Sequence, residues 1–164
     1  AFDYGTGKPS PLGMCIKNGI IYGDYMTSYS VMAVKKDGTI YTPAQGLMGK
    51  NLLAAGVKDT YNFGPVLIKD GEAQLPWAET EKYYPRTAVG MVKPNDYVLL
   101  VTDTGSYNGL NHWDMVDIFK SYGCTYAYNL DGGGSATLYF NGKVMNKLIG
   151  NTQRPCADFL YFTR

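Results

Sequence analysis

The sequence predicts an α+β fold, in which a mixed β-sheet packs against two helices. Short apolar runs separated by tight turns indicate strands along most of the chain, and two stretches carry apolar residues at helical spacing. The order of these elements recurs once, which indicates two pseudo-repeats of about 67–71 residues. Fifteen tyrosines and 20 glycines also favour strands and turns. We therefore expect one domain over residues 1–164.

Composition excludes several classes of partner. Hydrophobic residues make up 45% and charged residues 18%, as in a globular protein. Fifteen basic residues balance 14 acidic ones with no run of like charge, so nothing indicates nucleic acid or an anionic membrane as a partner. No apolar run approaches the roughly 18 residues of a membrane span. The oligomeric state stays open.

The three cysteines do not form a disulfide framework. Cys15, Cys124 and Cys156 are few and scattered, and none belongs to a CxxC pair. Cys124 and Cys156 lie in apolar sequence, so we expect buried structural thiols there, with a reactive thiol as the alternative.

The first half begins with strands and contains one helix. A strand that starts at residue 1 indicates that a preceding segment is missing. Asn18-Gly19 predicts a hairpin between two apolar runs. A strand, a turn and a short strand follow over residues 31–41, and then a helix from Pro43 that stops at Gly56. A further strand covers Val66–Ile68.

The second half repeats that order. A strand led by Arg86 precedes the strand Tyr97–Val101. A helix is expected from about Asn111 to Tyr122, with Asn111 as N-cap, Asp114 in a capping box and Gly123 just past its end. The remaining expected segments are the strand 128–130, a glycine turn, the strand 137–140 and a strand led by Arg154.

Matching positions support a duplication. Arg86 and Arg154 are 68 residues apart, and the second half has gained four residues after Asn129, where the glycines lie. A site is expected where such halves meet. Four pairs share a separation of 67 residues: Gly38 and Gly105, Gly56 and Gly123, Tyr61 and Tyr128, Asn62 and Asn129.

The run Asp131-Gly132-Gly133-Gly134-Ser135 is the expected functional centre. Three glycines after an apolar strand offer backbone N–H groups without side chains, and such concave sets of donors bind anions, phosphate above all. No Gly-Lys-Ser/Thr ends the run and no helix is expected after it, so neither a Walker loop nor a dinucleotide fingerprint fits. A flexible turn is the alternative.

Two carboxylates and two arginines are candidates for the chemistry. Asp131 is the first candidate for a catalytic carboxylate and Asp103 the second. Arg86 and Arg154 are suited to grip a phosphate with two hydrogen bonds. The alternatives are that Asp131 holds the glycine turn in shape and that both arginines are structural.

Other chemistries have little support in the sequence. The only histidine, His112, is expected on the exposed start of a helix as a surface or capping residue, which leaves Ser135 without a base for a catalytic triad. One histidine and no paired cysteines argue against zinc. No cofactor is expected, although an oxygen-liganded divalent ion at Asp131 or Asp103 stays open.

The run 129–137, together with Asn141-Gly142-Lys143-Val144, resembles the signature of the phosphodiester glycosidase family. Further similarities are the arginine-led strand Pro85–Gly90, the segment Phe63–Leu67 and Arg154-Pro155, so the resemblance covers nearly the whole chain. Members of the family usually carry sequence before an Ala-x-Asn-like segment, whereas this chain begins Ala1-Phe2-Asp3.

The resemblance implies hydrolysis of the bond between a sugar's anomeric carbon and a phosphodiester. It places seven residues in the site, and we add Thr87 beside Arg86. Together with Asp103, the full set of candidates for binding and catalysis here is Arg86, Thr87, Asp131, Gly132, Gly133, Gly134, Ser135 and Arg154. The implied substrate is a small glycosyl phosphodiester or an envelope polymer, handled outside the cell or at its envelope. A sugar-phosphate-binding module without catalysis and a structural role in an envelope or phage particle are the alternatives.

Overall fold

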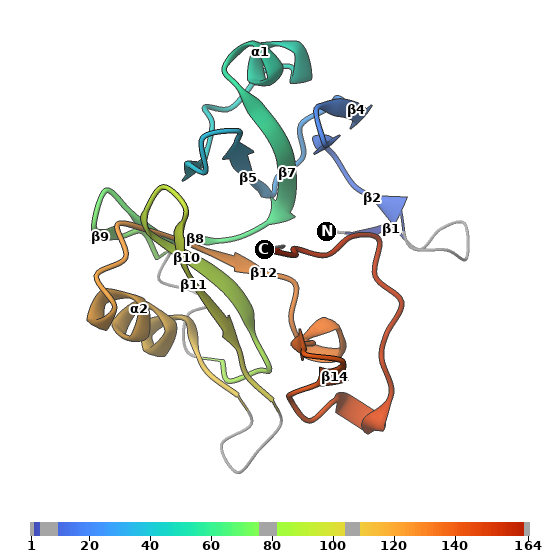
Figure 1. Ribbon diagram of the computed structural model, residues 1–164, viewed down its shortest axis with the longest axis vertical. Coiled ribbons are helices and arrows are strands. Elements are labelled where there is room, and N and C mark those ends of the chain that lie inside the picture. The colour runs from blue at the N-terminus through green and yellow to red at the C-terminus, as the bar shows by residue number, and fades with distance from the viewer. Residues whose placement is uncertain (1, 4–9, 76–81, 104–108, 163–164) are drawn as a thin grey trace.

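The computed structural model describes residues 2–3, 10–75, 82–103 and 109–162 and confirms the α+β class (Figure 1). Two helices, α1 (Gly49–Ala54) and α2 (His112–Ser121), accompany a set of short antiparallel sheets. No helix in these described ranges is both long enough and apolar enough to cross a membrane.

A five-stranded sheet forms the centre of the fold. Its order is β11-β10-β12-β8-β9, with β10 paired to β11 on one side and to β12 on the other. These strands are β8 (Val66–Lys69), β9 (Glu72–Ala73), β10 (Thr87–Lys93), β11 (Asp96–Val101) and β12 (Tyr126–Leu130).

The central sheet is not mixed, which corrects that detail of the predicted fold. Every strand pair in the described residues is antiparallel. A strand, a helix and a strand do follow one another as β11, α2 and β12, a pattern typical of parallel neighbours. However, β10 lies between β11 and β12, so these two strands never pair with each other.

Smaller sheets surround the central one. A three-stranded sheet has the order β6-β5-β7, and three hairpin-like pairs join β1 to β2, β3 to β4 and β13 to β14. Their bounds are β1 (Phe2–Asp3), β2 (Ser10–Pro11), β3 (Cys15–Lys17), β4 (Ile20–Gly23), β5 (Ser30–Lys35), β6 (Ile40–Tyr41), β7 (Val57–Phe63), β13 (Tyr139–Phe140) and β14 (Lys143–Val144).

Apolar side chains cover both faces of the central sheet. On one side α2 packs its apolar face against the sheet through Met115, Val116 and Phe119. Gly90 of β10 makes this contact possible, because a Cβ at that position would lie 2.5 Å from the Phe119 ring. On the other side Val89 and Tyr128 pack against residues of the three-stranded sheet.

Tyr128 joins the two halves of the molecule. Its hydroxyl accepts a hydrogen bond from the Phe63 N–H at 2.8 Å and donates one to the Ser30 carbonyl at 2.6 Å. Next to it, Asn129 donates from its side chain to the Gly64 carbonyl at 2.7 Å. Burial raises the pKa of Tyr128, so this hydroxyl stays protonated and keeps its role as donor.

Local turn and cap predictions are confirmed. Asn18 and Gly19 have φ of 50° and 78° at the turn of the β3–β4 hairpin, where left-handed backbone is required. Helix α2 begins after Asn111, whose side chain accepts from the Asp114 N–H while the Asp114 carboxylate accepts from the Asn111 N–H. Gly123 follows its end with φ of 74°.

Two predicted elements are wrong, one in where it begins and the other in its type. Helix α1 begins at Gly49 rather than Pro43, because Gly46 adopts a left-handed φ of 84° that no helix accommodates. The segment that begins at Arg154 is not a strand, since Pro155 lacks an N–H to donate to a neighbouring strand. The chain from Arg154 to Phe162 is instead irregular.

The proposed duplication stays a prediction. The order of strands and helices recurs along the chain, but the pairing does not, because β5 pairs directly with β7 whereas β10 separates β11 from β12. Of the matched glycines, Gly105 lies outside the described residues.

Candidate functional site

The candidate site lies at one end of the central sheet, where three neighbouring strands meet. Thr87, at the start of β10, pairs with Val101 at the end of β11 and with Leu130 at the end of β12. The residues that extend these strands are therefore neighbours. They include Arg86 before β10, Asp103 after β11 and Asp131 after β12, all of which the sequence singled out.

The glycine turn approaches the backbone of the neighbouring strand closely. A Cβ at Gly132 would lie 2.4 Å from the Pro85 carbonyl oxygen, so only glycine fits there. Gly133 has a left-handed φ of 55° and donates its N–H to the same Pro85 oxygen at 2.8 Å. The turn is thus fixed against the start of β10 as a short 3-10 turn over Gly133–Ser135.

Most amides of the turn are already hydrogen-bonded within the protein. Besides Gly133, the N–H of Gly132 donates to Asp131 and that of Ser135 to the Gly132 carbonyl. The Gly134 N–H has no such partner in the part of the chain that the structure describes. Of the three consecutive glycine amides expected to bind an anion, only the Gly134 N–H therefore remains available to a ligand.

Asp131, Ser135 and Arg154 form a connected network beside this amide. Arg154 Nη2 lies 2.8 Å from Asp131 Oδ2, and the Ser135 hydroxyl donates to the same oxygen at 2.8 Å. Arg154 also donates to the Ser135 hydroxyl, from Nε at 2.9 Å and from Nη2. The Arg154 side chain is 42% exposed and that of Asp131 21%, so a ligand can reach the guanidinium.

Asp131 also holds the turn in shape. Its other carboxylate oxygen, Oδ1, accepts the Gly132 N–H at 2.8 Å. The structural role expected as the alternative for Asp131 therefore accounts for part of its contacts. Its contact with Arg154 connects the same carboxylate to a residue that lies 23 positions later in the chain.

Arg86 has a different environment from Arg154. Its Nε donates to the Leu110 carbonyl at 3.1 Å and its Nη2 to the Lys82 carbonyl at 2.9 Å, and the guanidinium lies 5.3 Å from the centre of the Tyr84 ring. Burial lowers the pKa of Arg86, with an opposing effect of Tyr84. These contacts tie the start of β10 to the segment before α2.

Thr87 follows Arg86 as the first residue of β10. Its Oγ1 is buried and, among the described residues, has no hydrogen-bond partner. A buried hydroxyl of this kind is left with an unmet capacity to donate and accept. Among the described residues of the predicted site, Thr87 is the one with a buried side-chain polar atom that lacks a hydrogen-bond partner.

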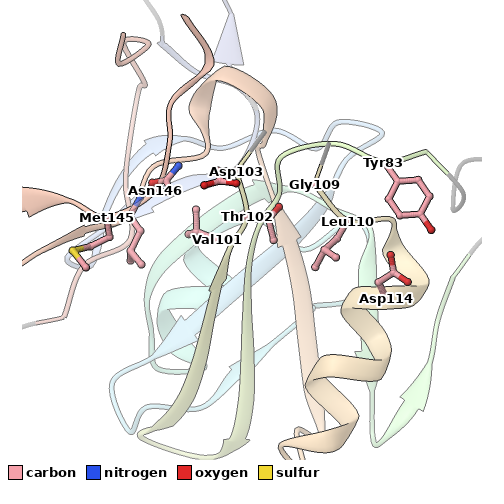
Figure 2. Close-up of a pocket in the computed structure, with 10 residues that line it drawn as sticks. Tyr83, Val101, Thr102, Asp103, Gly109, Leu110, Asp114, Met145 and Asn146 are labelled. Atoms are coloured by element: carbon pink, nitrogen blue, oxygen red, sulfur yellow. Dashed lines mark hydrogen bonds between the residues drawn. The ribbon is translucent and has the colours of Figure 1, made fainter. Parts of the chain in front are cut away.

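Asp103 lies on the wall of a pocket of about 640 Å³ at the same end of the sheet (Figure 2). Asp103 Oδ2 accepts from the Lys147 N–H at 3.2 Å, which fixes the segment after β14 against the end of β11. Figure 2 shows Asp103, Met145 and Asn146 on one side of the pocket and Tyr83 and Asp114 on the other.

Asn146 connects this pocket to the glycine turn. Its side chain donates to the Ala136 carbonyl at 2.9 Å and accepts from the Leu138 N–H at 2.7 Å, immediately after Ser135. Neither Asn146 nor Tyr83 belongs to a motif that marks it in the sequence. Asp114 was recognised only as a capping residue, although its position at the start of α2 places it near the end of β11.

Two residues differ from expectation. His112 is buried, with 6% of its surface exposed, because it lies on the same buried face of α2 as Met115, Val116 and Phe119. Cys156 is exposed instead of buried, and its Sγ lies 3.4 Å from the Ser135 hydroxyl. Cys15 and Cys124 are buried and unpaired, and burial raises the pKa of both thiols. In the described ranges no three His, Cys, Asp or Glu side chains are grouped to hold a metal ion.

Comparison with known proteins shows the family. A family model described as phosphodiester glycosidase matches residues 1–163. The SPbeta prophage-derived protein YomE of Bacillus subtilis is 31% identical over 160 residues, which cover 91% of this chain and 25% of that protein. The mouse N-acetylglucosamine-1-phosphodiester alpha-N-acetylglucosaminidase is 28% identical over 156 residues, which cover 79% of this chain and 29% of that enzyme.

A solved structure shares the fold. The catalytic domain of the zebrafish N-acetylglucosamine-1-phosphodiester alpha-N-acetylglucosaminidase, auto-inhibited by its pro-peptide, superposes with a TM-score of 0.71 at 23% identity. The match covers 96% of this chain and 58% of that one. This chain thus spans less than a third of the prophage and mouse proteins. With residues 1–163 matched by the family model, the chain belongs to the phosphodiester glycosidase family.

Proposed function

We propose that this chain hydrolyses glycosyl 1-phosphodiesters at the site formed by the glycine turn and the adjoining pocket. The observation that carries the proposal is the network of Asp131, Ser135 and Arg154 in a chain of this family. It brings a partly exposed cation and a carboxylate together beside the Gly134 amide. The substrate is a small glycosyl phosphodiester or an envelope polymer, and in the second case the chain acts outside the cytoplasm.

The proposed reaction breaks the bond between the anomeric carbon and the bridging phosphate oxygen. Water adds to the anomeric carbon and supplies the new sugar hydroxyl, while the phosphate leaves as a monoester with the bridging oxygen. A phosphate monoester is a stable leaving anion, so the main need is to stabilise its developing negative charge. Arg154 and the Gly134 N–H are the groups that supply this stabilisation.

Asp131 is the proposed catalytic carboxylate and Asp103 the second. A carboxylate near the anomeric carbon stabilises positive charge there or removes a proton from the attacking water. Asp131 is connected to the phosphate-binding group itself through the 2.8 Å contact with Arg154. In the proposed roles, Arg86 and Thr87 support the site from the start of β10, and Gly132, Gly133 and Ser135 fix its shape.

Isotope labelling tests the reaction directly. We expect hydrolysis of a glycosyl 1-phosphodiester in ¹⁸O-water to put the label in the sugar and none in the phosphate. Asp131→Asn should lower kcat/KM by about 10²–10⁴-fold. The same change at Asp117, which is exposed on α2, is the control and should leave turnover unchanged. Label in the phosphate, or full activity in Asp131→Asn, would contradict the proposal.

A sugar-phosphate-binding module without catalysis is the second candidate. It is favoured by the contacts of Asp131, because both carboxylate oxygens bond to groups of the turn or to Arg154. Measurable affinity for a glycosyl 1-phosphodiester with no turnover across a panel of sugars would support this candidate. Multiple turnovers by the purified chain would exclude it.

A further inference from the structure

The pocket and the glycine turn differ in the charge of their side chains. Two acidic side chains, Asp103 and Asp114, line the pocket, and none of its lining residues in the described ranges is Lys or Arg. The cation Arg154 lies outside it, in the network at the glycine turn. A ligand with an anionic group at one end and a neutral or cationic group at the other would therefore bind in one direction.

The pocket and the turn share a wall. Leu138 and Asn146 line the pocket, and Asn146 bonds to the Ala136 carbonyl and the Leu138 N–H just after the turn ends. On the other side, Thr102 lines the pocket and accepts the Arg86 N–H at 2.9 Å next to Pro85, which binds Gly133. The pocket and the turn are thus adjacent regions at the same end of the central sheet.

The far side of the pocket has the chemistry of a sugar site. Tyr83 presents a half-exposed aromatic ring, and Asp114 presents a carboxylate on the same side (Figure 2). Pockets that combine aromatic surface with a few fixed polar groups select a ligand's orientation and identity. A carboxylate accepts hydrogen bonds from hydroxyl or ammonium groups and repels another carboxylate.

We propose that Asp114, together with the Tyr83 ring, selects the sugar of the substrate, favouring neutral and amino sugars over those with a carboxylate. This inference rests on the proposed function, because it assigns the phosphate end of the ligand to Arg154. Asp114 is a specificity residue at the end of the pocket away from Asp103 and is separate from the residues that carry the reaction.

The position of Asp114 is fixed before any ligand binds. In the capping box of α2 its Oδ2 accepts the Asn111 N–H at 3.2 Å, and its own N–H donates to the Asn111 side chain at 2.8 Å. Asparagine at 114 keeps an oxygen that accepts the same N–H. Asp114→Asn therefore removes the charge while it preserves the helix cap.

Calorimetric binding of three sugar 1-phosphates tests the inference without any need for turnover. The probes are glucosamine 1-phosphate, glucose 1-phosphate and glucuronic acid 1-phosphate, measured on the full chain. We expect Asp114→Asn to weaken the preference for glucosamine 1-phosphate over glucuronic acid 1-phosphate by about five- to tenfold, the effect of one charge in a partly solvated site. Asp117→Asn, three residues along the same helix and exposed, is the matched control.

The outcomes separate this inference from the proposed function. An unchanged preference in Asp114→Asn, in a variant that unfolds at the same temperature as the wild type, overturns the inference even if hydrolysis is observed. A reduced preference in a chain that hydrolyses none of the corresponding phosphodiesters supports the inference and overturns the hydrolase. Tyr83→Leu provides a second test, because loss of the ring should weaken binding of all three probes.

Discussion

Arg86 and Arg154 occupy similar places in the two halves of the sequence but have different partners. Arg86 donates to the carbonyls of Lys82 and Leu110, which are neutral backbone groups. Arg154 contacts a carboxylate and a hydroxyl, and its side chain is more open to solvent. The difference indicates that Arg86 fixes the architecture around β10, whereas Arg154 is the arginine available to a ligand.

Of the changes that test this comparison, replacing the exposed arginine should have the largest effect on the rate. Arg154→Gln should lower kcat/KM for a glycosyl 1-phosphodiester by about 10²–10³-fold, as for loss of one donor that stabilises developing charge. The free energy of unfolding should change by less than about 1 kcal/mol, because the ion pair with Asp131 is partly exposed. Steady-state kinetics measure kcat/KM and urea unfolding measures the free energy of unfolding. An Arg154→Gln variant that loses stability but keeps its kcat/KM would contradict the roles assigned to the two arginines.

Arg86→Gln should have the opposite balance. Two carbonyls lose charged donors, so we expect the free energy of unfolding to fall by about 1.5–3 kcal/mol. Activity in the folded fraction should fall much less than in Arg154→Gln. Lys120→Gln, an exposed position on α2, is the control for loss of a positive charge. Equal losses of rate at both arginines would show that Arg86 also binds the phosphate.

A smaller effect is expected from the contacts that hold the chain after Arg154. Asp158 pairs with Lys17 at 2.8 Å, and the Tyr61 hydroxyl donates to the Phe159 carbonyl at 3.4 Å. Residues 154–162 form no helix or strand, so no regular backbone hydrogen bonds hold them in place. The contacts of Asp158 and Phe159 therefore help to position Arg154. Asp158→Ala should lower kcat/KM by about three- to tenfold, in line with loss of a half-buried pair. Asp117→Ala is the control, and an unchanged rate would show that Arg154 is positioned locally.

The smallest expected effect concerns the thiol beside the network. A maleimide should label Cys156 first at pH 8, because it is exposed, whereas burial raises the pKa of Cys15 and Cys124 and leaves them less thiolate. Mass spectrometry should show one adduct on the folded chain and three after unfolding. The adduct should hinder binding of the substrate beside Ser135 and so lower activity. The activity of Cys156→Ser should not change on treatment with the maleimide. Full activity of the labelled chain would place the ligand away from Ser135.

Local signals in the sequence predicted the parts of the fold that depend on neighbouring residues. Asn111, Asp114 and Gly123 fix the ends of α2 through contacts within a few positions, so their types alone indicate the helix. The start of α1 was harder to predict, because Gly46 adopts its left-handed conformation in a sequence that Pro43 also suits as a helix start.

The candidate site depends on contacts that the sequence does not record. The glycine turn and its flanking residues could be predicted, but the 2.8 Å contact between Arg154 and Asp131 follows from the path of an irregular segment. The burial of His112 and the exposure of Cys156 depend on which side of each segment meets the core. The pocket is lined by residues from separate stretches of the chain, and hydrophobic periodicity does not predict which stretches come together.

A crystal structure of the chain with bound glucosamine 1-phosphate would show directly which arginine binds the phosphate. We expect phosphate density within hydrogen-bonding distance of Arg154 and the Gly134 N–H, with the sugar in the pocket between Asp103 and Asp114. Phosphate bound at Arg86, or density away from the Gly132–Gly134 turn, would contradict it.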